Sequence, residues 1–379
     1  MSIINYQLTT YPLLPFSQLV YDMARWVPDL YRMAMSMRVV NGAPLLNRWQ
    51  NAFASALANH PVFSTEINRH GQRYKAPDNI LKGKYHHIIL QTNGPDLEIH
   101  GQISRILGDG TSLAILMDDI RRAYNGEPLA QDDYFGYLDY FEQYKQSQRY
   151  RDSKTWLEQE FADTTVPVHP TPDRSLWSLF PPKVGVFTDD YSARHKTINR
   201  FTKSQVLSME GFLSLCAALA IAEYCGTDSA ALTWAYEGRE RPEEQRVYGS
   251  LHKDVPFQLQ RSENRDELIK NARNQIRSGI AHSDYPYTLT APYNKRWNYA
   301  VNVLRVEDEH ALIKLLPQPI ELLPTPPQKI AYALLDVEIH ESFENLSIVY
   351  RYSATHYKES SIRRFAALVR KYVEWLLEE

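Results

Sequence analysis

Cysteine is scarce in this chain of 379 residues, which contains only two. Cys216 and Cys225 both fall in the helical run around Phe212, Leu215, Leu219 and Ala222, so the chain has neither a disulfide framework nor a cluster of cysteine metal ligands. We therefore expect no metal site and a reducing, cytoplasmic setting.

Long apolar runs are missing as well. No stretch of about 18 apolar residues could span a bilayer. The first residues, 1–7, lack the basic and apolar regions of a secretory signal. We expect a chain that is neither exported nor embedded in a membrane.

Excess charge and the common nucleotide and hydrolase motifs are also absent. A net charge of -3 gives no electrostatic reason to expect nucleic acid or a membrane surface as a partner. The sequence has no glycine-rich phosphate loop, no GxSxG serine elbow and no HExxH. Any partner must be recognised by a specific site.

What is present is the composition of an ordinary globular protein, with 44% hydrophobic and 23% charged residues. The length exceeds the usual limit for one hydrophobic core, which favours two α/β lobes. The proline-rich stretch 166–172 suits neither a helix nor a central strand. We therefore predict an N-terminal lobe at 1–170 and a C-terminal lobe at 171–379.

Hydrophobic periodicity predicts alternating helices and strands. Helices are expected at 43–58, 134–161, 208–224 and 266–277 and behind Ser360 and Ser361, and strands at 84–91, 97–105, 230–236 and 346–352.

Residues 97–126 form a predicted strand, tight turn and helix. Leu97, Ile99, Gly101 and Ile103 alternate along one strand face, and Arg105 would continue that face. Gly108-Asp109-Gly110 predicts a turn, Thr111 or Ser112 can cap the following helix, and Gly126 can end it.

The segment Ser104-Arg105-Ile106-Leu107-Gly108-Asp109-Gly110 resembles the HHxxxDG motif of nonribosomal peptide synthetase condensation domains, which are chloramphenicol acetyltransferase-like acyltransferases. Further stretches in the family's order extend the resemblance over essentially the whole chain. They are Tyr11 to Gln18 ("YPLSPAQ"), Ala56 to Thr65 ("RHExLRT"), Tyr137 to Tyr140 ("YxDYAxW"), Gly238 to Glu243 ("GRxRPE"), Tyr248 to Phe257 ("IGxFVNTLPLR") and Ala281 to Tyr287 ("xHQDxPFE").

The resemblance implies two chloramphenicol-acetyltransferase-like lobes in a V-shaped pseudo-dimer with a tunnel between them. Acyl or peptidyl carrier proteins would present donor and acceptor on phosphopantetheine arms, with no cofactor bound to the chain itself. The implied reaction forms an amide or ester from a thioester.

Several residues of this chain differ from the residues that carry the chemistry in the family. The second histidine, the family's general base, is Arg105 here, and a guanidinium has no lone pair to accept a proton near neutral pH. Ser104 replaces the first histidine, and Lys253 replaces the asparagine of "FVNTLPLR". The arginine of "LRT", which in the family pairs with the motif's aspartate, is Ser64.

A guanidinium group that points into the protein needs a carboxylate partner. We therefore predict an ion pair between Arg105 and Asp109 with a structural role. A substrate or anion contact and a surface position remain the alternatives for Arg105. Asp109 and Gly110 are expected to close the turn. The histidines weighed as replacement bases are His86, His87, His100, His252 and His282.

Two hypotheses follow. In the first, which we favour, the chain is a catalytically impaired condensation-fold scaffold that binds a carrier protein or a tailoring enzyme. Recruitment domains that resemble condensation domains carry an arginine at the position of Arg105 but keep a histidine where Ser104 stands. In the second, the chain is an active acyltransferase that relies on positioning and oxyanion stabilisation.

Overall fold

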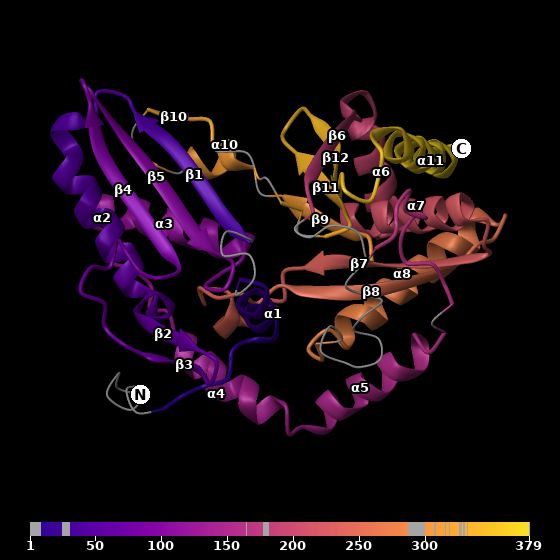
Figure 1. Ribbon diagram of the computed structural model, residues 1–379, viewed down its shortest axis with the longest axis horizontal. Helices are drawn as coiled ribbons and strands as arrows, with labels where there is room; N and C mark the ends of the chain where they lie inside the picture. The colour runs from indigo at the N-terminus through magenta and orange to yellow at the C-terminus, as the bar shows by residue number, and fades with distance from the viewer. Residues whose placement is uncertain are drawn as a thin grey trace. The chain divides into compact units, whose positions relative to one another are not determined.

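The chain folds into two compact units, each built from three separate segments. Residues 1–145, 239–252 and 307–327 form the first unit, and residues 146–238, 253–306 and 328–379 form the second. The computed structural model describes residues 9–24, 31–163, 165–176, 182–286, 300–306, 308–314, 316–317, 319–325, 328, 330–331 and 333–378 (Figure 1).

The first unit is built on an antiparallel four-stranded sheet in the order β10-β1-β5-β4. Its strands are β1 (Arg32–Val39), β4 (His86–Asn93), β5 (Asp96–Ser104) and β10 (Ile320–Leu322), and a separate hairpin pairs β2 (Thr65–Asn68) with β3 (Gly71–Tyr74). Its helices are α1 (Pro15–Ala24), α2 (Leu46–Asn59), α3 (Gly110–Asn125), α4 (Tyr134–Tyr144) and α10 (Glu309–Ile313).

The core of the first unit lies between this sheet and helices α2 and α3 (Figure 1). Leu97, Ile99 and Ile103 of β5 point into it, as the alternation predicts. Trp49 and Phe53 of α2 are fully buried on the same side. Burial of this apolar strand face fixes the register of β5 and therefore the position at which the motif segment begins.

The second unit is built on a six-stranded mixed sheet in the order β6-β12-β11-β9-β7-β8, in which β9 is parallel to both of its neighbours. Its strands are β6 (Val184–Asp190), β7 (Ser229–Tyr236), β8 (Lys253–Gln260), β9 (Asn302–Val306), β11 (Leu335–Glu341) and β12 (Leu346–Ser353). Its helices are α5 (Gln148–Glu160), α6 (His195–Gln205), α7 (Met209–Cys225), α8 (Arg265–Ala281) and α11 (Glu359–Leu377).

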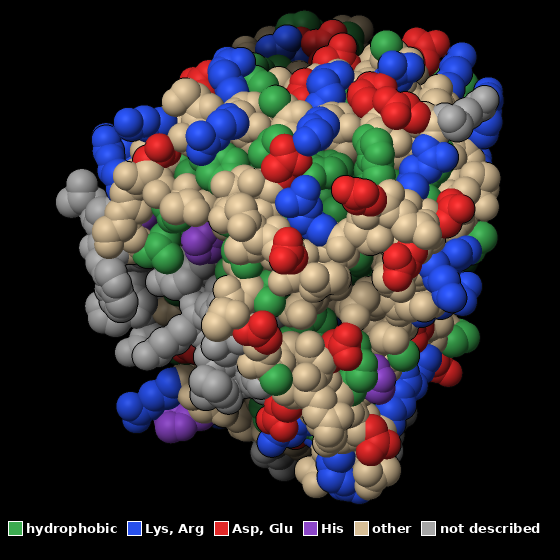
Figure 2. All heavy atoms as spheres, turned by 90° about the vertical axis from the view of Figure 1, so that its right-hand side faces the viewer, with side chains coloured by type: hydrophobic (Ala, Val, Ile, Leu, Met, Phe, Trp, Pro, Cys, Tyr) green, Lys and Arg blue, Asp and Glu red, His purple; other side chains and the backbone are tan. Residues whose placement is uncertain are grey.

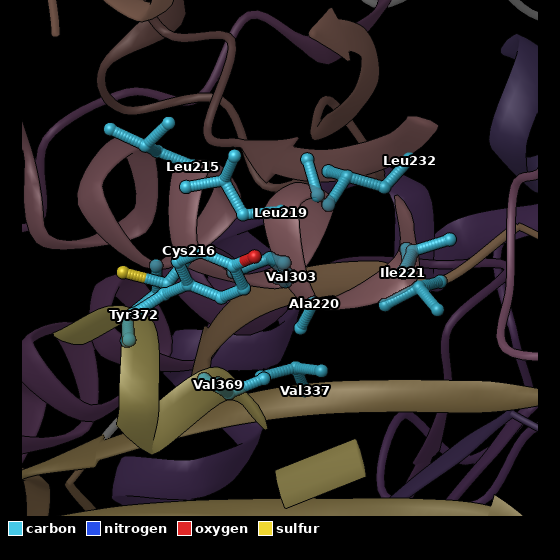
Figure 3. Close-up of a cluster of buried hydrophobic side chains, with 14 of the residues drawn as sticks. Leu215, Cys216, Leu219, Ala220, Ile221, Leu232, Val303, Val337, Val369 and Tyr372 are labelled. Atoms are coloured by element: carbon cyan, nitrogen blue, oxygen red, sulfur yellow. The ribbon is translucent and has the colours of Figure 1, made fainter. Parts of the chain in front are cut away.

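Helix α7 is the central helix of the second unit and is apolar on nearly all sides. Figure 3 shows Leu215, Cys216 and Leu219 of α7 beside Val303 of β9, with Val369 of α11 nearby. A helix covered on all sides has no need of a polar face, which explains its composition. Burial also raises the pKa of the Cys216 thiol well above its ordinary value, so this cysteine is a packing residue.

The proline-rich segment lies inside the second unit and does not mark the change of unit, which falls at 145/146. The Pro167 carbonyl accepts a hydrogen bond from Ala231 N at 2.9 Å, and the Val168 carbonyl accepts one from Val301 N at 2.8 Å. Proline is tolerated there because the pairing uses its carbonyl and requires no N–H. The observed units therefore differ from the predicted limits 1–170 and 171–379.

Most predicted elements are present within a few residues. The main difference is at 134–161, where one continuous helix was predicted and two helices, α4 and α5, are observed. Ser147 caps α5 by accepting a hydrogen bond from Tyr150 N at 3.1 Å. Ser147 also lies next to the boundary at 145/146, where the chain passes from the first unit to the second.

Within the described residues, no single helix is long and apolar enough to cross a membrane. The segments 192–205 and 209–225 pass such a test only as a pair, and they are bent by 98° with respect to each other.

Exposed charges of both signs are interspersed over the face of the molecule in Figure 2. This mixture agrees with the small net charge of -3.

Two phenylalanines of the second unit give a matched test of this core. Phe365 on α11 is 0% exposed, whereas Phe343 is 96% exposed. We expect Phe365→Ala to lower the free energy of unfolding by about 3–5 kcal/mol, because it removes a ring and leaves a cavity. Phe343→Ala should change it by less than about 0.5 kcal/mol. Urea unfolding of both variants measures the difference, and equal effects would contradict the described packing.

Candidate functional site

The motif segment joins β5 to α3 through a tight turn. β5 ends at Ser104, and Leu107 N donates to the Ser104 carbonyl at 3.0 Å, so the chain turns before Arg105 could continue the strand. The prediction that Arg105 extends the apolar face is therefore wrong. Arg105 is half-buried, and its backbone N–H donates to the Tyr31 carbonyl at 2.7 Å.

Asp109 caps helix α3. Its Oδ1 accepts from Ser112 N at 2.9 Å, and Ser112 Oγ completes a capping box. The predicted caps, Thr111 and Ser112, lie two and three residues beyond the observed cap, because Gly110 is already the first residue of the helix. Gly126 ends the helix in the left-handed conformation, with a φ of 73°, as predicted.

Asp109 is also paired with an arginine, but that arginine is Arg239. Arg239 Nη1 donates to Asp109 Oδ2 at 3.0 Å and Nη2 donates to Oδ1 at 2.9 Å, which makes a bidentate ion pair between two buried side chains. The predicted pair between Arg105 and Asp109 is not formed. Asp109 therefore has a cationic partner, although a serine, Ser64, stands where the family has an arginine.

Asp109 accepts two further hydrogen bonds, from Leu251 N at 2.9 Å and His252 N at 3.0 Å. Burial by itself would raise the pKa of this carboxyl group, but the charge and hydrogen bonds of Arg239 outweigh burial and hold the pKa below its usual range. Asp109 is thus an anionic structural centre, and it is not available as a proton acceptor near neutral pH.

Residues 239–252, which we call the strap, pack on the motif segment. Ser112 Oγ donates to the Gly249 carbonyl at 2.9 Å, and Ser250 Oγ donates to the Arg105 carbonyl at 3.0 Å. Gly108 faces the ring of Tyr248, where an added Cβ would lie 2.6 Å from Cε1. The glycine is required by this close approach.

The Arg105 side chain forms no ion pair with any carboxylate among the described residues. Its guanidinium carbon lies 5.8 Å from the ring centroid of Phe16 on α1, within range of a cation–π contact. A half-buried cation without a paired carboxylate is a fixed positive charge beside the motif.

His252 is the histidine nearest to this charge. Its ring meets Phe16 edge to face at a centroid distance of 3.9 Å, and its Nδ1 is buried without a hydrogen-bond partner. Burial, reinforced by the positive charge of Arg105, lowers the pKa of His252 to about 3. The imidazole is therefore neutral at pH 7, but it is a far weaker base than an ordinary histidine.

The serines at the other motif positions are structural. Ser104 is buried, and its Oγ accepts from Ile106 N at 3.3 Å. Ser64 is buried in the turn before β2, where its carbonyl accepts from Lys75 N at 2.7 Å. Neither serine is bonded to a histidine that could activate it as a nucleophile.

The other two predicted site residues, Lys253 and His282, belong to the second unit. Lys253 forms an ion pair with Asp284. His282 stacks on Trp156 at 4.6 Å, and its Nδ1 is 3.1 Å from Ser153 Oγ. Burial lowers the pKa of His282 too. Tyr287 of the same motif lies outside the described residues.

The remaining histidines weighed as bases have structural surroundings. His86 is buried at the start of β4, with Nε2 2.8 Å from the Ile80 carbonyl. His100 lies on the face of β5 away from the core, 3.1 Å from Ser36 Oγ, and His87 is exposed.

A second buried charge cluster lies in the first unit. His60 Nδ1 is 2.7 Å from Asp132 Oδ2, and His60 Nε2 is 3.2 Å from Asp119 Oδ2. Arg246 of the strap pairs with Asp119, and Tyr248 N donates to Asp132 at 3.0 Å. Burial by itself lowers the pKa of His60, but the two carboxylates outweigh burial and raise it.

Sequence reasoning missed Arg239, although the segment that contains it was recognised. The signal was available, because a buried carboxylate without its usual partner requires another cation. Arg239 lies 130 positions from Asp109 in the chain, so no local pattern connects the two. Among the described residues, no group of three or more His, Cys, Asp or Glu side chains is arranged to hold a metal.

Solved structures similar to this chain define its class. The X-domain from teicoplanin biosynthesis has a TM-score of 0.78 at 13% identity, covering 97% of this chain and 94% of that one. The epimerization domain from the third module of tyrocidine synthetase B has a TM-score of 0.73 at 16% identity, covering 97% and 96%. The first condensation domain of the calcium-dependent antibiotic synthetase has a TM-score of 0.71 at 14% identity, covering 98% and 96%. The chain thus has the chloramphenicol-acetyltransferase-like fold of condensation domains.

Residues 105–379 match the Condensation domain family, and the chain belongs to that family. A comparison with curated protein sequences gives no match.

Replacing each arginine by methionine in turn tests whether Arg239 or Arg105 is the partner of Asp109. Arg239→Met should destabilise the first unit by about 3–5 kcal/mol, because Asp109 is left charged and buried. Arg105→Met should cost less than about 1 kcal/mol, the value of a cation–π contact. Urea unfolding followed by tryptophan fluorescence measures both. A larger loss for Arg105→Met would contradict the observed pairing.

The His60 cluster predicts a pH dependence of stability. A histidine whose pKa is raised on folding contributes stability that is complete below its unfolded pKa of 6.5 and is lost as the pH rises through the folded value. The raised pKa of Asp132 acts in the same direction from more acidic pH, while the lowered pKa of Asp119 opposes it at acidic pH. We therefore expect the free energy of unfolding to fall as the pH rises above about 6.5.

His60→Gln should remove this fall, as measured by urea unfolding at a series of pH values. The exposed His70→Gln is the matched control and should keep the wild-type slope. An unchanged slope in His60→Gln would assign the pH dependence to other groups.

Proposed function

We propose that this chain is a catalytically impaired condensation domain that serves as a binding scaffold for an acyl or peptidyl carrier protein or a tailoring enzyme. Its setting would be the cytoplasmic assembly of a peptide or acylated metabolite. The carrier would present its cargo on a phosphopantetheine arm, which belongs to the carrier and is not a cofactor of this chain.

One observation supports the proposal most directly. The turn that holds the motif is intact, whereas the histidine that acts as the general base in the family is replaced by Arg105. The Asp109 cap, the Arg239 pair and the strap hold the turn in place. Arg105 stands where the imidazole of the family stands, and a guanidinium cannot accept a proton from an attacking amine. The fold has therefore been retained without the group that performs proton transfer.

The similarity to X-domain structures supports the recruitment of a partner enzyme. One of them is a complex of the X-domain with OxyB from teicoplanin biosynthesis, with a TM-score of 0.77 at 14% identity, covering 97% of this chain and 93% of that chain. That structure shows this fold binding another protein. The small net charge and mixed surface charges favour recognition by a shaped docking site over long-range electrostatic steering.

The second candidate function is acyl transfer through a non-standard site. His252 favours it, since this neutral imidazole has a buried, unpartnered nitrogen close to the motif. Arg105 would then stabilise developing negative charge. The low pKa of His252 counts against this candidate, because a weak base accepts little of the proton in the transition state.

An activity measurement separates the two candidates. Wild-type protein is mixed with an acyl-loaded carrier protein and an amine acceptor, and the amide product is measured by mass spectrometry against a reaction without the protein. We expect no product above background, because loss of a general base costs about 10²- to 10⁴-fold. Binding of the carrier or of a tailoring enzyme, measured by calorimetry with the same preparation, should be detectable.

Three variants sharpen the result. Ser104→His with Arg105→His restores the motif and should give at most trace product, because Ser64 and Lys253 still depart from the family. Arg105→Ala and His252→Ala should leave the reaction at background. Robust wild-type turnover that is lost in His252→Ala and weakened in Arg105→Ala would establish acyl transfer and overturn the scaffold. Absence of both turnover and binding would contradict both candidates.

A further inference from the structure

A polar groove lies at the edge of the six-stranded sheet, wholly within the second unit. It encloses about 340 Å³, which is in the lower range for small-ligand sites. Three elements line it: α5 contributes Trp156 and Glu160, β8 contributes residues 258–260, and α8 contributes the remaining side chains. The α8 residues are Asn271, Asn274, Gln275 and Ser278, which follow one another at helical spacing.

The floor of the groove is a strand edge. β8 ends the sheet and pairs with β7 alone among the described strands. Just beyond β8, Arg261 N donates to the Asp228 carbonyl at 2.7 Å. Because bonded pairs alternate along an antiparallel ladder, the backbone groups of Gln258 and Gln260 point to the outer edge.

Two amide oxygens in the groove are buried without a hydrogen-bond partner in the protein, Gln258 Oε1 and Gln275 Oε1. The orientation of the Gln275 amide is fixed by chemistry. Its Nε2 donates to Glu160 Oε1 at 2.6 Å, and a carboxylate can only accept, so the other atom must be the oxygen. A buried acceptor of this kind is costly unless a donor reaches it.

The charge of the lining indicates what that donor is. Glu160 is the one ionisable side chain among the lining residues, so the groove carries a single negative charge. The two buried lining atoms that lack a hydrogen-bond partner, Gln258 Oε1 and Gln275 Oε1, are both acceptors. The complementary group is a cation that donates hydrogen bonds, and an ammonium group has three N–H donors for one carboxylate and two amide oxygens.

We propose that this groove binds a primary ammonium group, with Glu160 as its charge partner and Gln275 and Gln258 as its neutral acceptors. The site involves none of the motif residues of the first unit, so it stands independently of the proposed scaffold function. Three oxygen ligands are too few for calcium, which takes six to eight, and this favours the ammonium over a hard metal ion.

Butylammonium chloride is the probe, and the indole N–H signal of Trp156 is the readout. The protein is labelled with ¹⁵N-tryptophan, and the signal is assigned with Trp156→Phe. We expect a saturable shift of the Trp156 signal, with the other tryptophan signals unmoved. Butanol, which has no charge, and tetramethylammonium, which has no N–H donor, should not reproduce the shift.

Glu160→Gln and Gln275→Leu should each weaken binding by roughly tenfold or more, the expected loss of a hydrogen bond to a charged group. Glu158→Gln is the matched control, since Glu158 lies on the same helix but does not line the groove. Its affinity should equal that of the wild type. No saturable shift, equal shifts with butanol, or full affinity in Glu160→Gln would each overturn the proposal.

Discussion

The Arg239–Asp109 ion pair is the interaction on which the architecture of the first unit's site depends. Asp109 simultaneously caps α3, holds the guanidinium of Arg239 and accepts two backbone N–H groups of the strap. The ion pair requires the ionised carboxylate, the hydrogen bonds from backbone N–H groups are stronger to it, and the arginine supplies the charge that keeps it ionised despite burial. The loop at 104–110 is therefore fixed by an ion pair that does not include Arg105.

This arrangement separates structural from catalytic requirements. The residues that hold the turn, Asp109, Gly108 and Arg239, make contacts inside the unit. The Arg105 side chain takes no part in those contacts and lies near the ring of Phe16, whereas Ser104 Oγ accepts a hydrogen bond from Ile106 N within the turn. Asp109, Gly108 and Arg239 therefore hold the turn without the Arg105 side chain.

Local patterns in the sequence predicted most elements of the fold. The alternation of Leu97, Ile99 and Ile103 located β5, and Gly126 located the end of α3. Two of the failures involve partners distant in the chain. Arg239 could not be assigned to Asp109 from spacing, and Pro167 was taken for a boundary because its pairing with Ala231 spans more than sixty residues. The turn at Ser104 depends on hydrogen bonds that alternation does not encode.

The interleaving of the two units has a consequence for synthesis of the chain. The first unit draws on residues up to 327 of 379, since it takes the strap and β10 from late segments. During translation β1 and β5 can pair early, but Asp109 is synthesised 130 residues before Arg239, and the edge of β1 stays unpaired until β10 has been made. A shortened chain that stops at the end of the first segment would retain this buried carboxylate without its cation. Long-range closure of this kind slows folding and leaves a strand edge exposed until β10 has paired.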